Sequence, residues 1–294
     1  MADRQGARQF ETYLASAYIP LMIQTPRLTD RSALTRNRHR AGRNPALFLQ
    51  EEAAAEIKDR LELVNRSFKS PAVVTGHPQV WQSLMPNARI VMDEDLLDLP
   101  DMAHDLVIHA LSLHWASDPV GQLIQARRAL RPDGLCLVSL FGGLTLHELR
   151  SALAEAEARI TGGLSPRILP MAEIRDLGGL LQRAGLALPV ADSVTIKVSY
   201  PDPFALMRDL RAMGEGNALE ARLRRPTRRS VLEEAARIYV DQHADDQGRI
   251  PATFEMIFLS GWAPDDSQPK PLRPGSAQAR LADALGSIES KLQD

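Results

Sequence analysis

The chain has 294 residues, of which 44% are hydrophobic and 24% are charged, so it can bury a large core and is not a disordered chain. Its formal net charge of −2 argues against a general nucleic-acid binder, and its longest uncharged apolar runs, such as residues 134–144, fall short of the ~18 residues that a membrane span requires. The first residues lack the layout of a signal peptide, and the one cysteine, Cys136, offers neither a disulfide nor metal-ligand spacing. We therefore expect a cytoplasmic protein without a metal site.

Arginines are concentrated in two stretches of the sequence. Residues 27–43 contain six arginines and one acid, and residues 222–230 contain five arginines and no acid. At neutral pH these stretches can meet an acidic partner or phosphate, or they can form the solvated face of a helix. We assign residues 1–44 to an N-terminal extension with an arginine-rich arm. Because little periodic pattern precedes Met22, we expect the functional protein to begin near that residue.

From residue 45 to residue 143 the pattern of apolar residues predicts helices alternating with strands. Helical spacing is visible over residues 45–65 and again over 118–134, where a Pro-Asp-Gly turn closes the segment. Short apolar runs rich in β-branched residues predict strands at 72–76, 88–92, 105–113 and 134–143. Continuous apolar strands that alternate with helices are typical of a parallel sheet covered on both faces. The expected fold class is doubly wound α/β, with a mostly parallel sheet.

After residue 143 the sequence becomes mainly helical. Helices are predicted over 144–160, 171–185, 203–223 and 229–244, and strands over 190–202 and 252–263. Two late strands separated by helices would suit an antiparallel hairpin at the edge of the sheet. We expect one domain over residues 45–264 with a helical insert at about 143–250, followed by a polar tail over 265–294.

Candidate binding residues come from the ends of the predicted strands, because open α/β sheets bind ligands beyond the carboxyl ends of their strands. These residues are Thr75, Gly76, Asp93, Glu94, Leu113 and His114. A single glycine is weak evidence for a cofactor loop, which needs several. Asp93 follows Gly76 by 17 positions, near the ~20-residue offset of an acid that meets a ribose hydroxyl, although a solvated loop is an alternative.

Two histidines fall near the end of the third predicted strand. His109 lies within the apolar run and is expected to be a core residue with its hydrogen bonds satisfied. His114 follows the strand beside Trp115, so it can line a pocket or pack inside the protein. No pattern of residues identifies a catalytic base.

Several segments resemble a known family. Residues 95–143, "DLLDLPDMAHDLVIHALSLHWASDPVGQLIQARRALRPDGLCLVSLFGG", are similar to the second half of a class I S-adenosylmethionine-dependent methyltransferase of the type that includes malonyl-ACP methyltransferase. The motifs "MGEGN" (213–217) and "PATFEMIFLSGW" (251–262) resemble more specifically the complex I assembly arginine hydroxylase subfamily and its alphaproteobacterial relatives. This resemblance runs from about residue 28 to 290. It implies S-adenosylmethionine as cofactor and a subunit of the bacterial NADH dehydrogenase as partner.

The resemblance also exposes a missing segment. Where members of the family have an acid and a Gly-x-Gly-x-Gly-like loop, this chain reads "VVTGHPQVW" (73–81), with Gly76 alone. A parallel crossover needs a dozen or more residues, so the 17 positions from Gly76 to Asp93 can hold one crossover but not two. We predict that one βα unit is missing and that the strand at 88–92 lies directly beside the strand at 72–75. By alignment Asp93 matches the acid near the adenine, the reading we prefer, whereas by spacing it is the ribose acid.

Two functions are therefore considered. One is a methyltransferase-like enzyme with S-adenosylmethionine in a pocket lined by the six candidate residues. The other is a non-catalytic assembly factor that meets its partner through the arm at 31–43 and a helix carrying Met213, Gly214, Glu215 and Asn217. Because the glycine-rich loop is degenerate, we expect S-adenosylmethionine to bind weakly or not at all.

Overall fold

The structure is a computed structural model that describes residues 27–269, so the expected start near Met22 and most of the polar tail lie outside the described residues. Within this range one six-stranded sheet has the order β2-β1-β3-β4-β6-β5. The strands are β1 (Pro71–Thr75), β2 (Arg89–Val91), β3 (His104–Ala110), β4 (Leu130–Phe141), β5 (Ala187–Tyr200) and β6 (Ile250–Trp262). Neighbouring strands are parallel except where β6 meets β4 and β5. The expected mostly parallel sheet with a late antiparallel hairpin is confirmed.

The sheet is one βα unit short, as the spacing predicted. Strand β2 pairs directly with β1, in a register that places Ala72 beside Arg89 and Val74 beside Val91. Between residues 76 and 88 the chain forms the short helix α4 (Pro78–Leu84) and no strand. Pro78 stands at the first turn of α4, where its missing N–H costs nothing.

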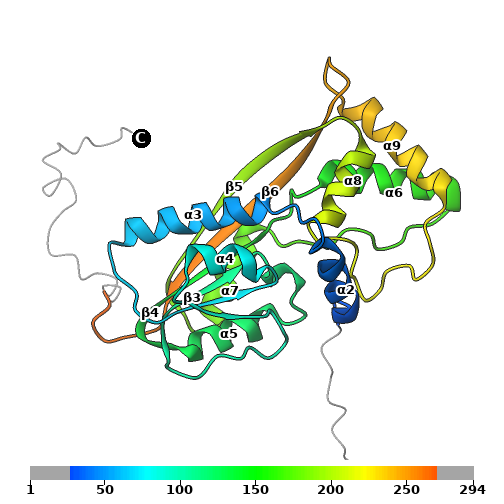
Figure 1. Cartoon of the computed structure of the whole chain (residues 1–294). Coiled ribbons are helices and arrows are strands. Elements are labelled where there is room, and N and C mark those ends of the chain that lie inside the picture. Colours follow the sequence, from blue (N-terminus) through cyan, green and yellow to red (C-terminus); the bar gives the residue numbers. More distant parts are fainter. Residues whose placement is uncertain (1–26, 270–294) are drawn as a thin grey trace, which may run out of the picture.

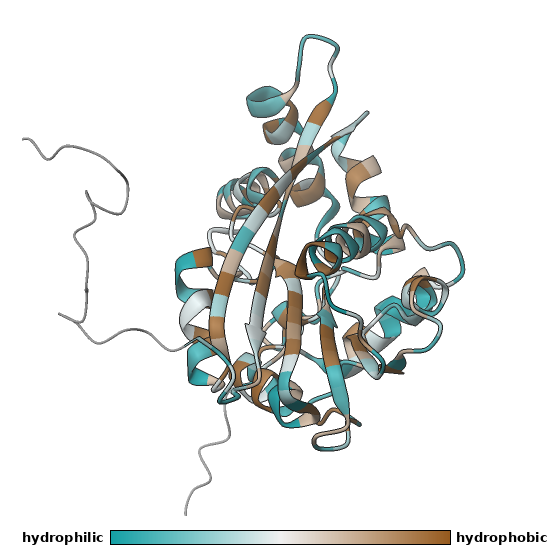
Figure 2. Cartoon of the chain, turned by 90° about the vertical axis from the view of Figure 1, so that its left-hand side faces the viewer, coloured by the Kyte–Doolittle hydropathy of each residue, from teal (hydrophilic) through white to brown (hydrophobic). Residues whose placement is uncertain are grey.

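Helices cover both faces of the sheet. They are α2 (Arg31–Ala41), α3 (Phe48–Val64), α5 (Pro119–Ala129), α6 (His147–Thr161), α7 (Ile174–Arg183), α8 (Pro203–Ala212) and α9 (Arg229–His243), besides α4. Successive residues of a strand point to opposite faces, so Val73 packs in the cluster under α3 and α4, whereas Ala72 packs in the cluster under α5 and α7. Figure 2 shows hydrophobic residues along the strands between these helices. The architecture is therefore doubly wound.

The helical insert forms its own layer. Helices α6, α8 and α9 gather beside the far ends of β5 and β6, away from α5 and α7 (Figure 1). Their apolar side chains join the cluster under α3, where Phe254 of β6 meets Phe48 of α3 edge-to-face. No helix between residues 27 and 269 combines the length and the apolar character needed to cross a membrane.

Two predicted helices are shorter than expected. The segment 118–134 is helical only to Ala129, and Leu130 already pairs with His104, because Pro132 cannot continue a helix. The segment 203–223 is helical only to Ala212, since Gly214 adopts a φ of +81°. The expectation of a helix carrying residues 213–217 is therefore wrong: these residues form the turn that follows α8.

Helix α2 is held over the carboxyl edge of the sheet by its first residues. The Asp30 carboxylate caps the helix by accepting a hydrogen bond from the Ala33 backbone N–H at 2.9 Å. The same carboxylate accepts from Arg222 at 2.8 Å, and Thr29 forms an isolated β-bridge with Leu219. The N-terminal segment is thus tied to the chain beyond α8, which fixes the position of the arginines that α2 carries.

Candidate functional site

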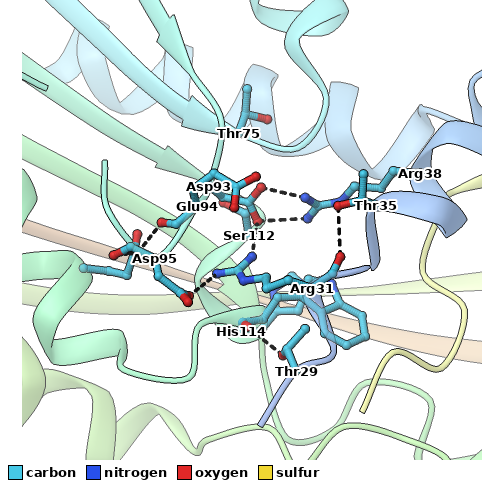
Figure 3. A network of polar contacts seen from close by, with 12 residues as sticks. Thr29, Arg31, Thr35, Arg38, Thr75, Asp93, Glu94, Asp95, Ser112 and His114 are labelled. Atoms are coloured by element: carbon cyan, nitrogen blue, oxygen red, sulfur yellow. Dashed lines mark hydrogen bonds and ion pairs between the residues drawn. The ribbon is translucent and has the colours of Figure 1, made fainter. Parts of the chain in front are cut away.

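The carboxyl ends of strands β1 and β2 face Arg38, which is part of helix α2. The guanidinium of Arg38 donates to both carboxylate oxygens of Asp93, at 2.6 and 3.0 Å, and Arg31 donates to the same carboxylate at 3.4 Å (Figure 3). The Asp93 side chain is only 5% exposed and that of Arg38 is 11% exposed. A bidentate arginine and carboxylate in a buried setting is one of the strongest ion-pair geometries in proteins.

This pair sets the ionisation of both residues. Burial opposes the charge of Asp93, but the charge and hydrogen bonds of Arg38, with help from Arg31, hold the pKa of Asp93 below its ordinary value. Burial likewise opposes the charge of Arg38, while Asp93 and the more distant Glu215 raise the pKa of Arg38. Both groups are therefore charged at neutral pH.

The Arg38 side chain also fills the space over Gly76. A Cβ placed on Gly76 would lie 2.2 Å from the Cζ of Arg38, so the guanidinium packs directly on the glycine backbone. In methyltransferase-like folds this loop and the following acid would approach the cofactor. Here the loop is covered and both oxygens of Asp93 are used by arginine. The residues present therefore do not fit S-adenosylmethionine in this arrangement.

A second carboxylate, that of Glu215, is only 12% exposed and lies near His114 and Trp115. Its Oε2 accepts a hydrogen bond from the indole Nε1 of Trp115 at 2.8 Å and lies 3.6 Å from Nε2 of His114. Its Oε1 is buried and has no hydrogen-bond partner among the described residues. Burial would raise the pKa of Glu215, but His114, Arg38 and His77 together lower it. Glu215 is therefore a buried anion with one oxygen unused.

Glu215 opens onto a cavity of about 200 Å³ between the sheet and the helical insert. The walls are mostly apolar and come from β4, α6, α8, β6 and the segment 167–171. Phe141 and Trp115 lie on the side of the sheet, and the exposed residues Arg211 and Asn217 stand at the surface. The cavity thus joins an apolar interior to one buried negative charge.

The six candidate residues are divided between different surroundings. Thr75 is fully buried and accepts a hydrogen bond from the His77 backbone N–H at 3.0 Å, next to Gly76 and below Arg38. The Glu94 side chain is exposed, while its carbonyl accepts from Gln122 at 2.6 Å. Leu113 packs in the apolar cluster under α5.

The two histidines, His109 and His114, also have different surroundings. His114 is buried against Phe141, with 5.0 Å between ring centroids, and faces Glu215. His109 is 1% exposed and has partners for both ring nitrogens, Gln122 at 3.2 Å and Ser112 at 3.1 Å. The prediction of a core histidine at 109 is confirmed.

The contacts of Arg31 and Arg38 with Asp93 were not predicted from the sequence, which left open whether the arm meets a partner, forms a solvated helix face or closes the fold over its own core. One signal was present: the two residues are seven positions apart, so they share a face of a helix that Asp30 can cap. Arg36, Arg40 and Arg43 remain exposed. Between residues 27 and 269 no group of His, Cys, Asp or Glu is arranged to hold a metal ion.

The chain is similar to several known proteins. A family model described as a methyltransferase domain matches residues 75–138, and the YcgJ protein of Bacillus subtilis, a solved structure, aligns with a TM-score of 0.43 at 13% identity over 68% of this chain and 94% of that one. The chain is also 35% identical to a malonyl-[acyl-carrier protein] O-methyltransferase of Halorhodospira halophila, over 59% of this chain and 57% of that protein. The sheet order and the domain match define the class I methyltransferase superfamily.

A more similar relative narrows the assignment. The chain is 36% identical to the protein named arginine-hydroxylase NDUFAF5, mitochondrial, of Danio rerio, over 78% of this chain and 72% of that protein. The chain belongs to the family of these arginine-hydroxylase NDUFAF5 proteins.

Proposed function

We propose that this protein acts on, or assembles, a subunit of respiratory complex I, the NADH dehydrogenase of bacteria. Membership of the arginine-hydroxylase family supports an arginine-bearing protein as its partner rather than a small molecule. The methyltransferase fold then serves as the framework that presents the site between the sheet and the insert. The cytoplasmic location expected from the sequence is part of this proposal.

One observation supports the proposal that the carboxyl ends of β1 and β2 do not bind a cofactor. The guanidinium of Arg38 lies on Gly76 and donates to both oxygens of Asp93. Hydrogen bonds to charged groups contribute about 1.5–3 kcal/mol each. Any ligand that needs Asp93 must first break two of them and move α2. We therefore expect weak binding of S-adenosylmethionine or none.

Within this function, the protein's own residues keep water from the ion pair and fix the orientation of Glu215. Arg38 and Arg31 neutralise Asp93, while Trp115 holds one oxygen of Glu215 by its indole N–H. The other oxygen is buried and has no hydrogen-bond partner among the described residues.

A second candidate function is S-adenosylmethionine-dependent methyl transfer. The methyltransferase-domain match over residues 75–138 favours it, because that segment contains all six candidate residues. In this alternative the cofactor would supply the methyl group, and Arg38 would have to leave Asp93 before Thr75, Gly76 and Asp93 could hold it.

Calorimetry with S-adenosylmethionine separates the two candidates. We expect no submillimolar binding to the wild-type protein. The Arg38→Ala variant, which frees Asp93, is measured in the same way. Its control is Arg36→Ala, because Arg36 is exposed on the same helix. Submillimolar binding that Asp93→Ala abolishes would support the methyltransferase alternative. It would contradict the view that Arg38 closes off Gly76 and Asp93 from the cofactor.

The partner is tested in the source organism. Deleting the gene is expected to lower the amount of assembled NADH dehydrogenase, measured by native gels and by NADH oxidation in membranes. A plasmid copy of the wild-type gene should restore both. Normal assembly in the deletion strain, with every subunit arginine unchanged in peptide mass spectra, would refute the proposal.

A further inference from the structure

We infer that the groove between the end of α2 and the end of α8 binds an acidic segment of another protein. The groove has a volume of about 550 Å³, and its lining includes neither Arg38 nor Asp93. This surface goes beyond the proposed function, because its chemistry selects a kind of segment whatever protein carries that segment. Three features indicate this ligand: how the groove is built, the charge on its walls and the residue types that form them.

The walls of the groove come from two segments that are far apart in the sequence. One wall is the second half of α2 with the residues after it, and the other is the end of α8 with the turn that follows. The Asn37 side chain donates a hydrogen bond to the Gly216 carbonyl at 3.0 Å, and the Ala46 N–H donates to the Ala212 carbonyl at 3.0 Å. These bonds fix the walls in place, so a ligand does not have to order them.

Helix α2 uses different faces for the sheet and for the groove. Arg31 and Arg38, seven positions apart, donate hydrogen bonds to Asp93 at the edge of the sheet. Asn37 and Arg40, three positions apart, share another face and line the groove. The arginine-rich arm therefore has an inward set of arginines, which stabilises the fold, and an outward set that is available to a ligand.

The walls carry positive charge that is not balanced locally. Arg40, Arg43 and Arg211 line the groove and are exposed, and none of them forms an ion pair with a residue between 27 and 269. No aspartate or glutamate is among the described residues that line it. A concave surface with one sign of charge attracts the opposite sign. Because guanidinium groups bind carboxylates through paired hydrogen bonds, the groove favours a ligand with several carboxylates.

The residue types of the lining indicate which anion fits. None of the described lining residues is aromatic, so the bases of a nucleic acid would find no ring to stack on. The apolar residues Ala41 and Ala212 are too small to enter a lipid bilayer. Asn44 is exposed and its amide is bonded to no described residue, so it can both donate to and accept from a peptide backbone. These features favour an acidic segment of a protein.

The test uses the full chain and synthetic peptides, with binding followed by calorimetry at low salt. The main probe is N-acetyl-hexaglutamate-amide, and its matched control is the hexaglutamine peptide, which has nearly the same shape without the charge. We expect the glutamate peptide to bind and the glutamine peptide not to bind at about 1 mM, and we expect the affinity to fall as salt rises. Equal affinities, or no binding of the glutamate peptide at about 1 mM, would overturn the inference.

Two double variants locate the site. Arg40→Ser combined with Arg211→Ser should weaken the glutamate peptide at least about fivefold, because two ion pairs with it are lost. Arg225→Ser combined with Arg228→Ser removes the same charge from exposed positions outside the groove and should change the affinity less than about twofold. An equal loss in both double variants would show that the peptide responds only to the total charge, and the inference fails.

A single variant tests the groove with all its arginines in place. Asn44→Asp adds a negative charge to the wall and should weaken the glutamate peptide severalfold, whereas Asn87→Asp, exposed between α4 and β2, should leave its affinity unchanged. Both positions are exposed, so circular dichroism should show the same fold as the wild type. If Asn44→Asp binds the peptide like the wild type, the peptide lies elsewhere and the inference is refuted.

Other anions serve as the last probes. An oligothymidylate of the same charge and phosphatidylglycerol vesicles should both bind more weakly than the glutamate peptide. Tighter binding of either, lost in the double variant of Arg40 and Arg211, would replace the acidic segment by a nucleic acid or a membrane and refute the inference. The proposed function can fail independently, because normal NADH dehydrogenase in the deletion strain would leave a groove-dependent preference for the glutamate peptide intact.

Discussion

Two carboxylates near Arg38, Asp93 at the end of β2 and Glu215 after α8, differ in how many of their oxygens have a partner. Both oxygens of Asp93 are taken by Arg38 and Arg31. Glu215 uses one oxygen on Trp115 and leaves the other buried without a partner among the described residues. The carboxylate at the edge of the sheet thus has partners for both oxygens, whereas Glu215 has a partner for one.

The contrast shows that Arg38 joins two parts of the molecule. At the strand ends that carry Gly76 and Asp93, it holds α2 against the sheet. Arg38 also acts on Glu215, because the charge of Glu215 raises the pKa of Arg38 and the charge of Arg38 lowers the pKa of Glu215. Changing Arg38 should therefore disturb both regions, first through stability.

The largest expected effect comes from Arg38→Ala. Removing one member of a buried ion pair leaves an uncompensated charge, which costs about 3–5 kcal/mol of unfolding free energy. Urea unfolding followed by circular dichroism measures this cost, and Arg36→Ala on the exposed face of α2 should stay within about 0.5 kcal/mol of the wild type.

A double variant checks that the cost comes from the pair. Arg38→Ala combined with Asp93→Ala should be less destabilised than the sum of the single variants by about 1–3 kcal/mol, since the unpaired charge is then absent. If the losses of unfolding free energy are additive, Arg38 stabilises the protein by packing alone and not through its ion pair with Asp93.

The elements of the sheet were largely predictable from the sequence because their signals are local. Runs such as "AVVTG" and "DLVIHALSL" predict buried strands, and the 17 positions from Gly76 to Asp93 leave room for one crossover only. Helix ends were less predictable, since Gly214 and Pro132 act within segments whose apolar spacing continues past them.

The site was only partly predictable, because its partners are far apart in the sequence. Asp93 and Gly76 were identified from their places after strands, but nothing local shows that Arg38, 55 residues before Asp93, turns toward them. Glu215 was noticed within a family-specific motif and was misplaced on a helix. Its role depends on contacts with Trp115 and His114, 100 and 101 positions earlier, which only the fold brings together.

A second prediction concerns how the free energy of unfolding depends on pH through the buried His109. Burial lowers the pKa of His109 from 6.5 to about 4, against the opposing effects of Gln122 and Asp93. The unfolded chain therefore takes up a proton near pH 6.5 that the folded protein refuses until about pH 4. Stability should be fully present above about pH 6.5 and fall by about 3 kcal/mol as the pH drops to about 4.

Urea unfolding at several pH values measures this fall in unfolding free energy, that is, its slope against pH. His109→Gln should flatten it, whereas His39→Gln, an exposed position on α2, should leave it unchanged. The buried His77, whose pKa is also lowered by burial, contributes with the same sign. Asp93 adds its own loss only at lower pH, below its ordinary value of 3.8, because its pKa is depressed. A flat profile between pH 7 and pH 5 would contradict the assignment of His109 as a neutral core residue.

The smallest expected effect isolates the contact between Arg38 and Gly76. In Gly76→Ala the new methyl group would meet the guanidinium at about 2.2 Å, so the side chain must move and lose part of its hold on Asp93. We expect a loss of about 1–3 kcal/mol, the value of a hydrogen bond to a charged group. Gly163→Ala is the matched control, because no atom lies within 4 Å of a Cβ there. In the Arg38→Ala background the Gly76→Ala cost should shrink to about 0.5 kcal/mol or less, since the space is then open. An equal cost in both backgrounds would show that the new methyl group does not meet the guanidinium, and that Arg38 does not cover Gly76.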